Sequence, residues 1–267
     1  MNTVRLSPDG KAAIATARDS ANSSDLWVYD LQRGVRRQFT SDPAEDIAPV
    51  WSPDGRTIVF ASNRSGGIRN LYRKPADASR SEELLFADTN SKSPSSISPD
   101  GKYLVYDDDT GTGGELWILA DPLGASTDRK AWKFMDKARR ASETISPDGH
   151  WITYSSLESG RSEVYVAPFP SPGGTKQVST GGGTQPRWRG DGRELFYLAP
   201  DDHLMVAALS ASRGTLDVGK IEQLPTRAPY GYDVTSDGQR FLAIAPPEGQ
   251  ATAQMNVILN WTALLKK

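Results

Sequence analysis

A four-residue turn sequence recurs along the chain at nearly regular intervals. Ser-Pro-Asp-Gly occurs four times and two weaker copies follow, so that the copies begin at Ser7, Ser52, Ser98, Ser146, Arg189 and Thr235. In each full copy Pro presets φ, Asp bonds its own backbone and Gly accepts a positive φ, which predicts a tight turn between two strands. The aspartates of successive copies are 45, 46, 48, 43 and 46 residues apart. A period of this size without helical patterning predicts one small sheet per repeat.

Strand-forming segments flank these turns. Runs rich in β-branched and aromatic residues follow them, such as Thr57 to Ala61 and Trp151 to Tyr154, and a third apolar run such as Asp25 to Tyr29 comes next. A more polar fourth segment, such as Val35 to Phe39, completes most repeats. Apolar middle strands beside a polar outer strand favour sheets that pack face to face around an axis, with the core between them.

We therefore predict an all-β fold, a six-bladed β-propeller that forms a single domain. The blades are expected at residues 1–43, 44–89, 90–137, 138–181, 182–227 and 228–267. A β-sandwich with accidental turn repeats is the alternative. The residues before Asp9 and after Asp237 together fall short of one period, so the last blade is expected to lack a full outer strand. Its strand near Trp261 would then expose an edge that could pair with a second copy, unless Lys266 and Lys267 blunt it.

Composition excludes several classes of function. The 31 Lys and Arg residues nearly balance the 33 Asp and Glu residues, and a net charge of -2 supplies no global attraction to nucleic acid or anionic membranes. This balance does not exclude a local patch. The absence of cysteine excludes disulfides, thiolate nucleophiles and Cys-ligated zinc. We expect no membrane-spanning segment and find no signal-peptide pattern in these residues, so the compartment stays open.

Four of the repeats resemble the Ser-Pro-Asp-Gly-Lys/Arg motif of TolB-like propellers. Lys11, Arg56 and Lys102 follow the glycine in three copies and His150 in the fourth. Longer segments look like the C-terminal propeller of bacterial proteins associated with serine/threonine kinase domains, namely Leu26 to Leu31, Pro49 to Gly55, Gly182 to Trp188, Glu194 to Pro200, Tyr232 to Thr235 and Val257 to Leu265. The resemblance implies a propeller outside the cytoplasm. Members of the wider class dock proteins, gate peptidase domains or, in some cases, catalyse reactions, and the fold does not choose among these roles.

The first strands of the blades would line a central channel, which is the best place for a ligand. We predict binding residues there at Arg5, Asp46, Lys92, Arg140, Glu143, Gln185, Arg187, Tyr232 and Asp233. This mixture of acids, bases and amides suits a peptide terminus, a sugar or a carboxylate. A water-filled pore whose charges neutralise one another is the alternative.

Signals for catalysis are few. If the protein is an enzyme, Asp46 and Glu143 are the leading candidates for a paired acid and base. No cofactor is predicted, although a divalent cation such as calcium in the channel is compatible with these carboxylates. His150 and His203 are expected in exposed turns. Five tryptophans recur at matching strand positions and are predicted to belong to the core between blades, namely Trp27, Trp51, Trp117, Trp151 and Trp188.

We therefore predict a non-catalytic platform that binds a protein or a small ligand at the channel mouth. The alternative is a hydrolase with a carboxylate site in the channel, with or without a metal ion.

Overall fold

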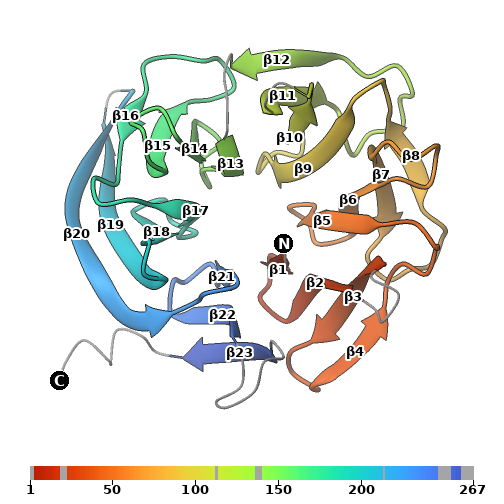
Figure 1. Ribbon diagram of the computed structural model, residues 1–267, viewed down its shortest axis with the longest axis horizontal. Coiled ribbons are helices and arrows are strands. Elements are labelled where there is room, and N and C mark those ends of the chain that lie inside the picture. Colours follow the sequence, from red (N-terminus) through yellow and green to blue (C-terminus); the bar gives the residue numbers. More distant parts are fainter. Residues whose placement is uncertain are drawn as a thin grey trace. The chain divides into compact units, whose positions relative to one another are not determined.

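The computed structural model describes residues 3–18, 23–111, 114–135, 140–212, 214–245 and 254–259 of the 267-residue chain. All regular elements in these ranges are strands, which form six antiparallel sheets (Figure 1). The chain divides into two compact units, Asn2–Ala138 and Arg139–Lys267, and each contains three sheets. The all-β prediction is confirmed.

The unit Asn2–Ala138 contains three four-stranded sheets, each made of strands consecutive in sequence. The first sheet comprises β1 (Val4–Leu6), β2 (Ala12–Arg18), β3 (Ser24–Asp30) and β4 (Val35–Gln38). The second comprises β5 (Asp46–Trp51), β6 (Thr57–Ser62), β7 (Asn70–Pro75) and β8 (Glu83–Phe86). The third comprises β9 (Ser91–Ile97), β10 (Tyr103–Asp109), β11 (Gly114–Ala120) and β12 (Ala131–Met135).

The unit Arg139–Lys267 repeats this plan with different strand lengths. The fourth sheet comprises β13 (Arg140–Ile145), β14 (Trp151–Ser156), β15 (Glu163–Pro168) and β16 (Lys176–Gln177). The fifth comprises β17 (Thr184–Trp188), β18 (Glu194–Leu198), β19 (His203–Ser212) and β20 (Thr215–Arg227). The sixth comprises β21 (Tyr232–Val234), β22 (Arg240–Ala245) and β23 (Gln254–Leu259).

The prediction of six blades is wrong. In the described ranges five sheets have four strands and are complete blades, whereas the sheet that carries the last turn motif has three. The physical reason is that the motif forms the hairpin between the first two strands of a sheet and carries no information about a fourth strand. Trp261 and residues 263–267, on which we predicted an exposed edge or a ragged outer strand, lie outside the described residues.

Each full turn motif is held by its own atoms. In the third copy the Ser98 hydroxyl donates to Asp100 at 2.6 Å, and the same Asp100 oxygen accepts the Lys102 backbone N–H at 3.1 Å. The hydroxyl oxygen also accepts the Tyr103 N–H at 2.9 Å, which starts the next strand. Gly101 has a φ of 73°, a value that favours glycine. These bonds explain why this sequence forms a hairpin at each repeat.

The hydrophobic core lies between neighbouring sheets of a unit. Ile14 and Leu26 of the first sheet pack with Phe60 of the second, and all three side chains are fully buried. In the other unit Phe196 of the fifth sheet packs with Phe241 of the sixth, with ring centroids 5.1 Å apart. A sheet cannot bury both faces alone, so the sheets stabilise one another within each unit.

The first strands carry a recurrent backbone irregularity. Ala48, Ser142 and Gln185 have φ values of 53°, 62° and 53°, and each lies four residues before a motif. The pairing register of the strand shifts at the same places. These are β-bulges, which redirect side chains at the end of a strand.

No helix among the described residues is long and apolar enough to cross a membrane.

Candidate functional site

The nine predicted binding residues all lie on first strands, but they divide between the two units. Arg5, Asp46 and Lys92 lie on β1, β5 and β9 of one unit. The other six lie on β13, β17 and β21 of the other unit, namely Arg140, Glu143, Gln185, Arg187, Tyr232 and Asp233.

The structure brings four of them together on β17 and β21. The Arg187 Nε atom lies 3.5 Å from the Asp233 carboxylate, and the Arg187 guanidinium lies 6.0 Å from the centre of the Tyr232 ring. Arg187 also donates to the carbonyl of Pro186 at 2.7 Å, while the Tyr232 hydroxyl donates to the carbonyl of Gln185 at 3.0 Å. Arg187 and Tyr232 are only 5% and 1% exposed. This cluster therefore fastens the fifth sheet to the sixth rather than presenting its groups to solvent.

Asp46 is committed to an ion network. Arg64 donates to both oxygens of its carboxylate at 3.0 Å and also pairs with Glu82, which lies 3.2 Å from Lys74. The Asp46 side chain is fully buried. Burial raises the pKa of Asp46, and hydrogen bonds from Ser62 and Arg64 oppose that shift. Arg64 therefore binds both oxygens of this buried carboxylate.

Lys92 also interacts with neighbouring groups of the protein. Its ammonium is fully buried, pairs with Asp88, lies 3.8 Å from Asp108 and donates to the carbonyl of Asn90 at 2.9 Å. Burial raises the pKa of Asp108, and the positive charge of Lys92 opposes the shift. Lys92 thus compensates the buried carboxylate of Asp108 and the exposed carboxylate of Asp88.

Two of the remaining predicted residues, Arg5 and Glu143, have described side chains on β1 and β13. Glu143 is buried on β13 and belongs to a different compact unit from Asp46, so neither unit by itself contains the proposed acid and base. Arg5 donates to the carbonyl of Val4 at 3.1 Å. Arg140 is the first residue of β13, and its side chain lies outside the described part of the structure.

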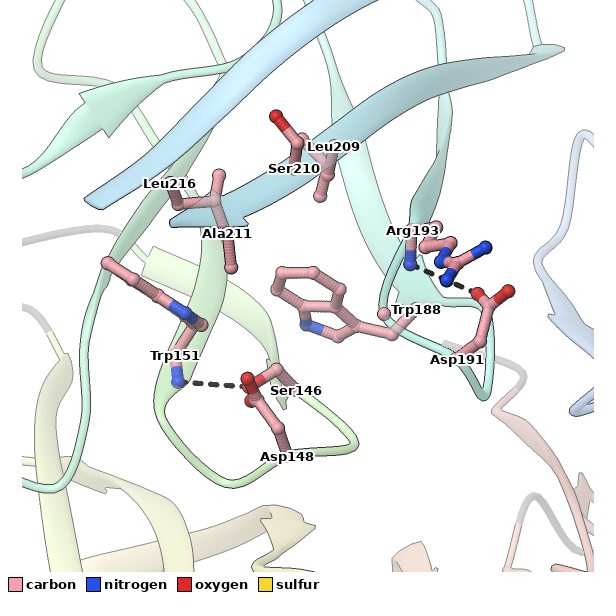
Figure 2. A pocket seen from close by; sticks show the side chains of 11 residues that line it. Ser146, Asp148, Trp151, Trp188, Asp191, Arg193, Leu209, Ser210, Ala211 and Leu216 are labelled. Carbon is pink, nitrogen blue, oxygen red and sulfur yellow. Dashed lines mark hydrogen bonds between the residues drawn. The ribbon is translucent and has the colours of Figure 1, made fainter. Parts of the chain in front are cut away.

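A pocket that the sequence did not predict lies between the fourth and fifth sheets (Figure 2). We call it the tryptophan pocket, because Trp151 and Trp188 line it together with Ser146, Asp148, Asp191, Gly192, Arg193, Leu209, Ser210, Ala211 and Leu216. Its volume is about 340 Å³, which is within the range of small-molecule sites. Figure 2 shows the turns of both sheets on one side and strands β19 and β20 on the other.

The long β19–β20 hairpin builds one wall of this pocket. Its strands have 10 and 13 residues, whereas the outer strand β16 of the neighbouring sheet has only two. The Lys176 ammonium on β16 donates to the Leu216 carbonyl at 3.0 Å and pairs with Asp217 at 2.8 Å. The end of the hairpin is thereby tied to the fourth sheet, where Leu209 and Leu216 cover the core.

Hydrogen bonds hold the ring of Trp188 and the backbone of Trp151. Trp188 donates its ring N–H to the carbonyl of Thr144 at 3.2 Å, and the backbone N–H of Trp151 donates to the Ser146 hydroxyl at 2.9 Å. Both rings are half-buried and pack against the core, so each presents only part of its surface. Two ordered aromatic rings offer a ligand apolar contact at low entropic cost.

The polar groups of the pocket suit binding better than catalysis. Asp148, Asp191 and Arg193 are all exposed, so the lining carries charges of both signs. The Ser146 hydroxyl donates to Asp148, but the equivalent bond joins Ser52 to Asp54 and Ser98 to Asp100, and it is therefore a turn feature rather than an activated nucleophile. Within the described ranges there is no group of three or more His, Cys, Asp or Glu residues that could hold a metal ion.

The tryptophan prediction was incomplete. Trp51, Trp117, Trp151 and Trp188 do pack against the cores between sheets, as expected. Trp27 instead lies under the Arg36 guanidinium, 4.8 Å from the ring centre. The sequence signal for the pocket was the placing of Trp151 just after one turn motif and Trp188 just before the next, which puts both indoles at neighbouring turns.

Comparison with known proteins supports the TolB-like resemblance. Residues 2–129 match the family described as the TolB beta propeller domain. A 102-residue segment is 32% identical to the Tol-Pal system protein TolB of Wolinella succinogenes and covers 38% of this chain and 23% of that protein. The chain thus spans about a quarter of this relative, and it spans 18% of the peptidase YuxL of Bacillus subtilis, to which it is 28% identical over 118 residues.

Solved structures share the fold at low sequence identity. TolB from Acinetobacter baumannii superposes with a TM-score of 0.72 at 14% identity, covering 95% of this chain and 62% of that one. Oligogalacturonate lyase from Vibrio parahaemolyticus gives a TM-score of 0.61 at 12% identity, covering 96% and 74%. At such identities the likeness concerns the fold alone.

Proposed function

Since residues 2–129 match the TolB beta propeller domain and the fold resembles that of TolB, we propose that the chain is a non-catalytic binding platform whose ligand site is the tryptophan pocket. The observation that carries the proposal is the contrast between this pocket and the predicted first-strand site. The pocket is open and presents two ordered indoles beside exposed polar groups. Arg187, Asp46 and Lys92 are instead buried and engaged by neighbouring protein groups.

The geometry favours a ligand group that is neutral and has both apolar and polar surface. The carboxylates of Asp148 and Asp191 disfavour an anion, while the guanidinium of Arg193 disfavours a cation. The indoles of Trp151 and Trp188 favour a flat apolar surface. We expect this group to belong to a partner protein in an extracytoplasmic compartment, an expectation that the likeness to TolB supports.

Affinity capture with purified variants tests the proposal. Immobilised wild-type protein is expected to retain a partner. The amount retained should fall at least tenfold with Trp188→Ala and stay unchanged with Trp132→Ala. Trp132 is a matched control, because it lies on β12 of the other unit, is 37% exposed and stacks edge-on against Tyr103. Circular dichroism of each variant, and Trp188→Phe, which keeps most of the packing, separate loss of binding from loss of fold. Equal retention by all variants would remove the pocket from the proposal.

A second assay separates the platform from the hydrolase alternative. A panel of ester, phosphate, sulfate and glycoside chromogens, with and without a chelator, is expected to give no turnover above background. Robust turnover that Glu143→Gln abolishes would replace the platform with an enzyme. The variant preserves the size of this buried side chain, so a folded but inactive protein would be informative.

A further inference from the structure

We propose that strand β4 is a docking edge for an acidic, extended segment of a partner protein, which adds to the first sheet as a further strand. We call the region the basic edge and define it by Lys11, Arg33, Arg36 and Arg37 together with the backbone of β4. It lies in the unit Asn2–Ala138 and does not depend on the tryptophan pocket.

Strand β4 is the last strand of its sheet in the described residues, where β3 is its only pairing partner. All four of its residues are exposed, and Val35 retains 57% of its surface. The Phe39 N–H donates to Leu26 of β3 at 2.8 Å. Because successive residues of an antiparallel strand alternate in direction, the main-chain groups of Arg36 and Gln38 face away from β3. An edge with outward N–H and C=O groups is a template for one more strand.

The side chains around this edge are strongly positive. A hollow of about 480 Å³ is lined by four basic side chains and by a single carboxylate, that of Asp30. Asp30 lies 3.9 Å from Arg33, and Lys11 lies 3.8 Å from Asp9. Both pairs are long and exposed, so they neutralise little of the charge. The whole chain has a net charge of -2, and this concentration of positive charge is therefore local.

Two of the arginines are already held in place. The Arg36 guanidinium lies 4.8 Å from the centre of the Trp27 ring, and Arg37 donates to the carbonyl of Ala76, the residue after β7 of the second sheet. A guanidinium that is ordered before binding loses less side-chain entropy when a carboxylate pairs with it.

The combination favours an acidic peptide over other anions. A nucleic acid or a lipid headgroup would use the positive charges but leave the outward main-chain groups of β4 unpaired. An extended peptide satisfies both, because its backbone pairs with Arg36 and Gln38 while alternate carboxylates reach the basic side chains. Val35 adds an exposed apolar contact.

A synthetic peptide in which Glu alternates with Val and Thr tests this proposal, with binding measured by calorimetry on the full chain. We expect binding that weakens with added salt, and at least a tenfold loss in Arg33→Glu/Arg36→Glu. The matched control, Arg80→Glu/Lys130→Glu, makes the same change of charge at exposed sites of the same unit and is expected to bind normally. Equal weakening in both variants would show only general electrostatics and would overturn the site.

A backbone variant tests the added strand separately from the charge. Gln38→Pro removes the outward N–H of β4 and keeps every basic residue, and it is expected to weaken the peptide severalfold, whereas Gln38→Ala does not. Unchanged binding by Gln38→Pro would refute strand addition. Tighter binding of anionic vesicles or a single-stranded oligonucleotide than of the peptide would refute the choice of partner, and no binding of any probe would refute the site.

Discussion

At the scale of single residues, hydrogen bonds within the turns stabilise the ionised form of the turn aspartates. Hydrogen bonds from Ser98 and from the Lys102 backbone lower the pKa of Asp100 to about 2. The corresponding bonds from Ser7 and from Ser52 lower the pKa of Asp9 and of Asp54. Each of these groups stabilises the folded state only while it is ionised.

Asp100→Asn is expected to cost about 1 kcal/mol at neutral pH. The pKa of Asp100 is depressed in the folded state, so its contribution is present above the ordinary value of 3.8 and is lost as pH falls toward about 2. The full shift would correspond to roughly 2 kcal/mol in a buried group, and we halve it because the side chain is 48% exposed. Urea unfolding at several pH values should show wild type and variant converging in acid. Asp128→Asn, at an exposed loop aspartate, should show no such convergence.

The residues of the predicted site could be placed on first strands from sequence, because each lies two to six residues before the start of a turn motif. The ion-pair partners of these residues could not be predicted from sequence. Asp46 pairs with Arg64 and Arg187 with Asp233, and these pairings depend on which side chains meet within a sheet and across sheets. The same limit hid the tryptophan pocket, since Trp151 and Trp188 look like ordinary core residues until the β19–β20 hairpin is in place.

At the scale of elements, the contacts between β16 and the β19–β20 hairpin stabilise one wall of the tryptophan pocket. Lys176→Met keeps the aliphatic part of the side chain but removes the bonds to Leu216 and Asp217. Hydrogen exchange of residues 209–218 is expected to rise severalfold, with a loss of global stability of at most about 1 kcal/mol because the pair is exposed. Lys220→Met, which removes an ion pair within β20 alone, is the control and should leave exchange at the hairpin end unchanged.

The sequence predicted the second and third strands of the sheets better than the fourth. Apolar runs such as Thr57–Ser62 are specified by burial on both faces, whereas β16 has two exposed residues and no hydrophobic pattern. The bulges at Ala48, Ser142 and Gln185 were also missed, because no glycine marks these positive-φ positions.

At the scale of the whole molecule, the repeat period predicted the number of sheets but not the number of complete blades. The period counts hairpins, and a blade needs a fourth strand that the motif does not encode. The boundary between the two compact units has no mark in the sequence, because every repeat looks alike.

Substitutions in the two cores test that division. Phe60→Ala and Phe196→Ala each remove a fully buried ring and are expected to cost about 3–5 kcal/mol. If each unit is a cooperative unit of its own, exchange measured by mass spectrometry will rise mainly over residues 2–138 for Phe60→Ala and over residues 139–267 for Phe196→Ala. A uniform rise across the chain in both variants would show that the units unfold as one.

The last two turns differ from the earlier ones in how they could evolve. The Gly190 N–H donates to the carbonyl of Ser236 at 2.8 Å, and a Cβ atom at Gly190 would lie 2.0 Å from the Ser236 hydroxyl. A self-closed turn such as that of Ser98 can be copied by gene duplication and can drift without regard to its neighbours. The turns at Gly190 and Ser236 are in contact, so a substitution that adds a Cβ at Gly190 requires Ser236 to change as well.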